Sequence, residues 1–154
     1  MTDYYADSSA LMKRHVRERD TIWFQSLTNP AAGNTIATAQ VSEVEVYSAL
    51  NRRLHESHLS FLDYTQIADD FATICATEYK IIELTDAVIE QSRLLLERHS
   101  LRAYDAIQLA SALLANATLQ AAGFTPLIFL AADARLLSAA QAEGLLTDNP
   151  NAHL

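Results

Sequence analysis

The stretch YYADSSAL, residues 4–11, joins a short β-prone run to a helix-like pattern through one acid, Asp7. The stretch FLAADARLLSAA, residues 129–140, repeats this arrangement with Asp133 at the junction. Between them, segments typical of strands alternate with segments typical of helices. This order predicts an α/β fold with a mostly parallel sheet and helices on its faces.

The rest of the chain can be divided into elements by composition and periodicity. Strands are predicted at residues 3–6, 35–38, 79–84, 127–131 and 145–147, and helices at 9–19, 21–27, 41–54, 60–78, 86–99, 103–122 and 134–143. Residues 28–34, which include Pro30 and Gly33, are predicted to be a loop. Because sites in parallel sheets gather at the carboxyl ends of strands, Asp7 and Asp133 are expected at that edge.

Length and composition predict a single domain, residues 1–154, with half of its residues apolar. No signal peptide or membrane span is evident. Cys75 is the only cysteine, which excludes an internal disulfide and the usual zinc clusters, and a cytoplasmic protein is expected. The net charge of −8 argues against nucleic-acid binding, although Lys13, Arg14, Arg17 and Arg19 form a local basic cluster.

Several acids suit structural roles as well as chemical ones. Asp7 and Asp133 stand where an N-cap aspartate is preferred. Glu45 follows Ser42 at the spacing of a capping box. Glu43 is a second candidate on that helix, and because two residues on a helix are about 200° apart, both glutamates cannot face one site. The helix is apolar around most of its circumference, so periodicity leaves the choice open.

Asp105 lies in LRAYDAIQLASALL, residues 101–114, among apolar neighbours. A first-turn acid favoured by the helix dipole is one explanation. A carboxylate among core residues is nevertheless costly without a partner. Four carboxylates gathered at one sheet edge would repel one another, and a divalent cation such as Mg²⁺ or Mn²⁺ relieves that repulsion. Such a site suits phosphoryl transfer.

Four motifs carry these acids: YYADSSAL (4–11), VSEVEVYSAL (41–50), LRAYDAIQLASALL (101–114) and FLAADARLLSAAQAEGL (129–145). In order and spacing they resemble the acidic motifs of PIN-domain nucleases, above all the VapC-like toxins of bacterial toxin–antitoxin systems. The resemblance covers nearly the whole chain. It implies a three-layer α/β/α sandwich and a Mg²⁺- or Mn²⁺-dependent ribonuclease.

The resemblance also implies a metal site made by Asp7, Glu45, Asp105 and Asp133. Glu45 is favoured over Glu43 because VEVYSAL aligns with the family's "VE…AL" core.

Ser9 matches a small hydroxyl residue that commonly lies beside the first acid of the family. One departure is Ala131, where many members carry Thr or Ser two residues before the fourth acid. A hydrogen bond that supports the metal ligands is therefore predicted to be missing or supplied by water.

Partners follow from the same resemblance. RNA is the implied substrate, and its phosphates require basic side chains near the acids. Each candidate base could instead belong to a solvent-exposed helix face with no role in binding. The candidates are Lys13, Arg14, Arg52, Arg53 and Arg102. A cognate antitoxin and a homodimer are also implied, and the acidic net charge would complement a basic antitoxin segment. Apolar residues of the 44–77 segment are candidates for core packing or for such an interface.

Two other functions fit the same acids: a non-catalytic protein-interaction module with this fold, and a small metal-dependent phosphatase. No D-x-D-x-T, GxxxxGK[ST] or GxGxxG motif supports the phosphatase. The histidines lie mostly in polar stretches and are predicted to be surface residues. They are His15, His55, His58, His99 and His153.

Overall fold

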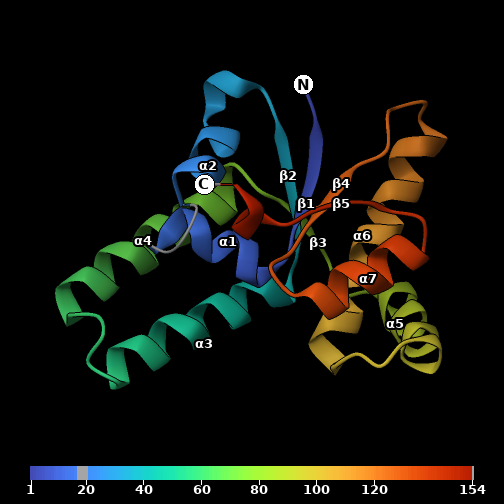
Figure 1. Cartoon of the computed structure of the whole chain (residues 1–154). Coiled ribbons are helices and arrows are strands. Elements are labelled where there is room, and N and C mark those ends of the chain that lie inside the picture. Colours follow the sequence, from blue (N-terminus) through green and yellow to red (C-terminus); the bar gives the residue numbers. More distant parts are fainter. Residues whose placement is uncertain (17–20, 154) are drawn as a thin grey trace.

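The computed structural model describes residues 1–16 and 21–153. Five strands form one sheet in the order β3-β2-β1-β4-β5, and all four neighbouring pairs are parallel (Figure 1). The strands are β1 (Asp3–Ala6), β2 (Thr35–Ala39), β3 (Lys80–Ile82), β4 (Ile128–Leu130) and β5 (Leu146–Asp148). The predicted α/β class with a parallel central sheet is confirmed.

Seven helices cover the two faces of the sheet in the described part of the chain. One group is α1 (Ser8–His15), α2 (Thr21–Thr28), α3 (Val41–His55) and α4 (Phe61–Thr77). The other is α5 (Asp86–Arg98), α6 (Ala103–Ala121) and α7 (Ala134–Ala142). Figure 1 shows the first group on the left of the sheet and the second on the right. No helix among the described residues has both the length and the hydropathy needed to cross a membrane.

The alternation of side chains along the strands creates two hydrophobic cores. Tyr5 and Phe129 are fully buried on one face, where their rings stack 5.5 Å apart beneath α5, α6 and α7. Their neighbours Ala6 and Leu130 face the other side and pack against α1 to α4. Because successive strand residues point to opposite faces, these short strands supply apolar contacts to both helical layers. The result is the three-layer sandwich.

The first helix differs most from its prediction. It begins at Ser8, one residue early, because Asp7 caps it, and it ends at His15, where Val16 adopts an extended conformation. Residues 17–19 of the predicted helix lie outside the described residues. The predicted loop 28–34 contains a short 3-10 turn, Pro30–Ala32, and another such turn, Pro150–Ala152, was not predicted. The other predicted elements agree with the structure to within two residues at each end.

Helix α4 is apolar in sequence but poorly covered. Phe71 is its one buried residue, whereas Phe61 and Leu62 in its first turn are 72% and 76% exposed. Ordinary core packing, one of the two predicted roles for this segment, therefore accounts for Phe71 but not for Phe61 and Leu62.

Candidate functional site at the carboxyl edge of the sheet

The Asp7 side chain is buried where β1 ends and α1 begins, with 5% of its surface exposed. Its Oδ1 atom accepts the backbone N–H of Ala10 at 2.9 Å, which is the N-cap contact, and the hydroxyl of Ser9 at 2.6 Å. None of the described residues donates a hydrogen bond to Oδ2. The carboxylate therefore caps the helix with one oxygen and keeps the other for a further ligand.

The Ser9 hydroxyl connects the ends of the two central strands. It donates to Asp7 and accepts the backbone N–H of Ala132 at 3.1 Å. The backbone N–H of Asp7 in turn donates to the Leu130 carbonyl at 3.1 Å. Ala131, which has no hydroxyl to offer, is fully buried. Ser9 thus adds a side-chain link between Asp7 and the residues after β4, beside the backbone bond from Asp7 to Leu130.

Asp133 occupies the equivalent junction after β4. It is the N-cap of α7, and its Oδ1 atom accepts the backbone N–H groups of Arg135 at 2.8 Å and Leu136 at 3.2 Å. Its side chain is exposed, in contrast to that of Asp7. Both junction acids are therefore helix caps as well as neighbours of the sheet edge.

Glu45, and not Glu43, is directed to this edge. Its Oε2 atom accepts the Ser8 hydroxyl at 2.9 Å and its Oε1 atom accepts the Gln108 amide at 2.8 Å. Glu43 lies on the α4 side of α3, where its charge, after burial, helps to raise the pKa of the Cys75 thiol to about 12. The orientation of α3 thus distinguishes Glu45 from Glu43, a choice that the sequence periodicity left open.

The capping-box alternative for Ser42 and Glu45 is wrong. Helix α3 has no side-chain cap, and Ser42 lies inside its first turn. The Ser42 hydroxyl instead accepts the hydroxyl of Thr38 at 2.7 Å and the amide of Gln108 at 2.9 Å. Ser42 is thus part of a buried polar network beneath Glu45.

Gln108 is the centre of that network, and the sequence analysis missed it. It is 1% exposed, its amide nitrogen donates to Glu45 and Ser42, and its amide oxygen accepts the Tyr5 hydroxyl at 2.5 Å. One signal was available: a single amide side chain stands in an apolar helical run, one turn after Asp105. Such a residue needs hydrogen-bond partners when it is buried.

The four acids act on one another electrostatically. Burial raises the pKa of Asp7 to about 7; the Ser9 and Ala10 hydrogen bonds oppose this shift, and the charges of Glu45 and Asp105 add to it. Burial also raises the pKa of Asp105, as does the charge of Asp133. The acids expected from the sequence are therefore linked through mutual repulsion.

The donor set suits a hard divalent cation, since all of the candidate ligands are carboxylate oxygens. Within residues 1–16 and 21–153, however, no three acidic, histidine or cysteine side chains are arranged so as to hold a metal ion. Glu45 is engaged by Ser8 and Gln108. The four carboxylates therefore have the right chemistry for a divalent cation. Their side chains would have to move closer together to coordinate one.

Three of the five predicted RNA-binding bases lie together beside the acids. Lys13, Arg52 and Arg53 line a groove of about 400 Å³ that also contains Ser9 and Ala132. We call it the basic groove. Lys13 is buried there and Arg52 is exposed. Arg102 precedes α6, and its charge opposes the rise that burial causes in the pKa of Asp105.

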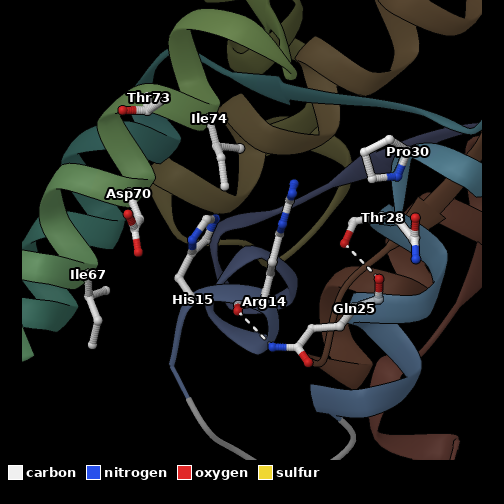
Figure 2. Close-up of a pocket in the computed structure, with 10 residues that line it drawn as sticks. Arg14, His15, Gln25, Thr28, Pro30, Ile67, Asp70, Thr73 and Ile74 are labelled. Atoms are coloured by element: carbon white, nitrogen blue, oxygen red, sulfur yellow. Dashed lines mark hydrogen bonds between the residues drawn. The ribbon is translucent and has the colours of Figure 1, made fainter.

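Arg14 lies elsewhere, in a hollow of about 520 Å³ between α1, α2 and α4 (Figure 2). Its guanidinium pairs with Glu78 at 2.8 Å and lies over the Tyr79 ring. His15 lies in the same hollow, where it contacts the Tyr79 hydroxyl at 2.8 Å and Phe71 edge-on. Partial burial lowers its pKa to about 4, and because the side chain is half-buried, the prediction of a surface histidine holds only in part for His15.

Comparison with known proteins places this geometry in a family. A family model described as the PIN domain matches residues 4–142. The chain belongs to the PIN domain family. No curated protein matches the chain closely enough to count as a relative.

Solved structures share the PIN fold at low sequence identity. VapBC2 of Rickettsia felis, bound to a DNA fragment from its promoter, matches with a TM-score of 0.66 and 12% identity over 96% of this chain and 98% of that chain. FitAcB of Neisseria gonorrhoeae gives 0.62 and 13% over 98% and 99%. Mycobacterium tuberculosis VapC20, described as a toxin that cleaves the sarcin–ricin loop, gives 0.60 and 17% over 93% and 96%.

Asp7→Asn should stabilise the metal-free protein at high pH. The folded-state pKa of Asp7, about 7, lies above the ordinary value of 3.8, so the folded chain retains a proton that the unfolded chain releases. Stability from that proton is complete below about pH 4 and is lost as the pH rises through about 7. Asn keeps the cap without the charge. The free energy of unfolding, measured in urea, should therefore be higher for the variant than for wild type by up to about 4 kcal/mol at pH 8. The difference should be small at about pH 4.

Asp133→Asn is the matched control, because it makes the same change at an exposed N-cap and should give no comparable gain. An Asp7→Asn protein that is no more stable than wild type at high pH would contradict the buried-charge account of Asp7.

Gln108→Leu should destabilise the protein by about 2–4 kcal/mol, because Tyr5, Ser42 and Glu45 would each lose a buried partner. Gln141→Leu removes an exposed contact to Thr147 and should change stability by no more than about 0.5 kcal/mol. Chemical denaturation measures both. Equal losses for the two variants would mean that the network is not coupled as described.

Proposed function

We propose that this PIN-domain protein is a metal-dependent endoribonuclease, the toxin of a toxin–antitoxin pair. The observation that carries the proposal is the gathering of a buried Asp7 with Glu45, Asp105 and Asp133 at one end of a PIN fold, where burial and then neighbouring acidic charge raise the pKa values of Asp7 and Asp105. A bound divalent cation would favour the charged form of the buried Asp7 carboxylate and offset the repulsion from its acidic neighbours. A PIN fold with such acids is best explained as a nuclease.

In the proposed site, Asp7, Glu45, Asp105 and Asp133 hold one or two Mg²⁺ or Mn²⁺ ions. A bound divalent cation supplies an activated water and stabilises the departing oxygen of a phosphodiester. Hydrogen bonds from Ser9 and Ala10 to Oδ1 hold the Asp7 carboxylate in place and leave Oδ2 free for a metal ion. Gln108 and Ser8 set the direction of the Glu45 carboxylate. An RNA substrate and a lone unpaired thiol both suit the cytoplasm, which we propose as the compartment.

The proposed protein partner is an antitoxin. Its support is the similarity to structures solved as toxin–antitoxin complexes, such as VapBC2 and the Klebsiella pneumoniae complex. The exposed Phe61 and Leu62 of α4 offer an apolar surface of the kind that marks an interface. The net charge of −8 favours a partner with a basic segment. A homodimer is the other proposed use of this surface.

Two alternatives make different claims about the same acids. A non-catalytic interaction module would keep them without hydrolysing any phosphoester. A small metal-dependent phosphatase would hydrolyse a small phosphoester and leave RNA intact. The raised pKa values of Asp7 and Asp105 favour a site built for a cation over an inert module, but do not separate the two enzymes.

RNA cleavage tests the proposal. Wild type with Mg²⁺ or Mn²⁺ should cut RNA, and Asp105→Asn should lower the rate by about a hundredfold or more, because it removes a charge on which the cation depends. Asp86→Asn is the matched control: Asp86 is also an acid in a first helical turn, on α5, and it is exposed. This variant should cut like wild type. Cleavage products resolved on denaturing gels provide the measurement.

The result against the proposal is equal inactivity of wild type and Asp105→Asn on varied RNAs with metal present. Hydrolysis of p-nitrophenyl phosphate without RNA cleavage would establish the phosphatase instead.

A further inference from the structure

The amino end of the sheet, opposite the acidic edge, contains a mostly apolar cavity of about 270 Å³. It lies between the sheet and the second half of α6, over the starts of β1, β2 and β3. Its apolar lining includes Ala37, Ile82, Ala115, Leu119 and Leu127, which all belong to the core beneath α5, α6 and α7. The four acids of the proposed metal site do not line it, so the cavity is a separate feature of the fold.

The cavity exists because small side chains meet where helix and sheet pack together. Ala37 of β2 and Ala115 of α6 both line it, and an alanine side chain is too short to fill the space between the two layers. Protein interiors are otherwise closely packed, and unfilled apolar space forfeits packing contacts and costs stability. A ligand whose apolar body fills this space would recover those contacts.

Two opposite charges stand at the boundary of the cavity. Asp3 begins β1 and Lys80 begins β3, and both line it. Each stands two residues before a side chain of the same core, Tyr5 or Ile82, so both point to the same face of the sheet. Strand β2 separates them by two strand spacings, about 10 Å, which is too far for direct pairing. Among residues 1–16 and 21–153, neither side chain has an ion-pair or hydrogen-bond partner.

The lysine has a structural explanation, but the aspartate has none. Strand β3 is an edge of the sheet, where a lysine discourages pairing with another chain. Asp3 lies instead on an inner strand and is half-buried, although aspartate is depleted in strands and a half-buried carboxylate without a partner is costly. Unpaired opposite charges on two sides of an apolar cavity complement a ligand that has an ammonium group at one end and a carboxylate at the other.

We propose that this cavity binds a small zwitterion with an apolar body, of the class of short peptides of apolar residues. The ligand's ammonium group pairs with Asp3, its carboxylate pairs with Lys80, and its apolar side chains fill the space between Ala37 and Ala115. Two extended residues span about 7 Å, and the flexible lysine side chain covers the remaining distance. The volume restricts the ligand to a small molecule. The proposal does not rest on the proposed nuclease function.

Isothermal titration calorimetry with the dipeptide Leu-Leu tests the proposal. Wild type should bind Leu-Leu, and it should bind N-acetyl-Leu-Leu and Leu-Leu amide each about tenfold more weakly, because each blocked form lacks one charged contact. Methyl NMR spectra recorded in the same titration should show shifts concentrated at Leu119 and Leu127, which line the cavity.

Variants assign each charge to its end of the ligand. Asp3→Asn should bind Leu-Leu about tenfold more weakly and no longer distinguish it from the N-acetylated form, and Lys80→Gln should no longer distinguish it from the amide. Ala115→Leu should fill the cavity, raise the urea midpoint of unfolding and abolish binding. Asp86→Asn and Arg93→Gln are matched controls for charge, because both residues are exposed on α5 and neither lines the cavity. Both controls should bind like wild type.

The proposal is overturned if wild type binds no Leu-Leu at millimolar concentration and the methyl spectra do not change. It is also overturned if the blocked dipeptides bind as tightly as Leu-Leu, or if Asp3→Asn and Lys80→Gln behave like the two controls. These measurements report binding alone, so a failure of the proposed nuclease function would leave their outcome unchanged.

Discussion

A buried carboxylate, Asp7, lies beside other acids at the carboxyl edge of the parallel sheet, and the proposed chemistry depends on this arrangement. Asp7 is buried, with Glu45 and Asp105 near enough to raise its pKa, and Asp133 has the same effect on Asp105. Separately, Asp7, Asp105 and Asp133 each have a structural explanation as a cap or a first-turn acid. Capping and repulsion coexist, because a cap uses one carboxylate oxygen and leaves the other available. A cation resolves the repulsion without any change in the fold.

The fold keeps these acids in place through a few short polar contacts. Ser9 connects the Asp7 junction to the end of β4, and Gln108 connects Glu45 to Tyr5 and Ser42 in the layer below. These contacts join β1, β4, α3 and α6, which are distant in sequence. A buried network of this kind fixes side-chain directions only while each member is satisfied. These contacts therefore fix the directions of Asp7 and Glu45, and a cation would still have to draw the four carboxylates together.

Much of this could be predicted from the sequence, for identifiable reasons. The alternation of strand and helix patterns is local, so the element order and the α/β class follow from it. The caps at Asp7 and Asp133 are also local. The direction of Glu45 relative to Glu43 depends on how α3 packs, which no periodicity encodes in a helix that is apolar on most sides. The contacts of Gln108 join distant segments, and His15 is half-buried against Phe71 of α4 and Tyr79.

The most direct test of the central account is the position of a bound metal. Crystals grown or soaked with Mn²⁺ and measured for anomalous scattering should give a peak among Asp7, Glu45, Asp105 and Asp133, with the carboxylates drawn in around it. The same measurement on Asp7→Asn should show a weaker peak or none. A fully ordered edge with no peak, or a peak bound by other residues, would contradict the claim that these acids form a cation site.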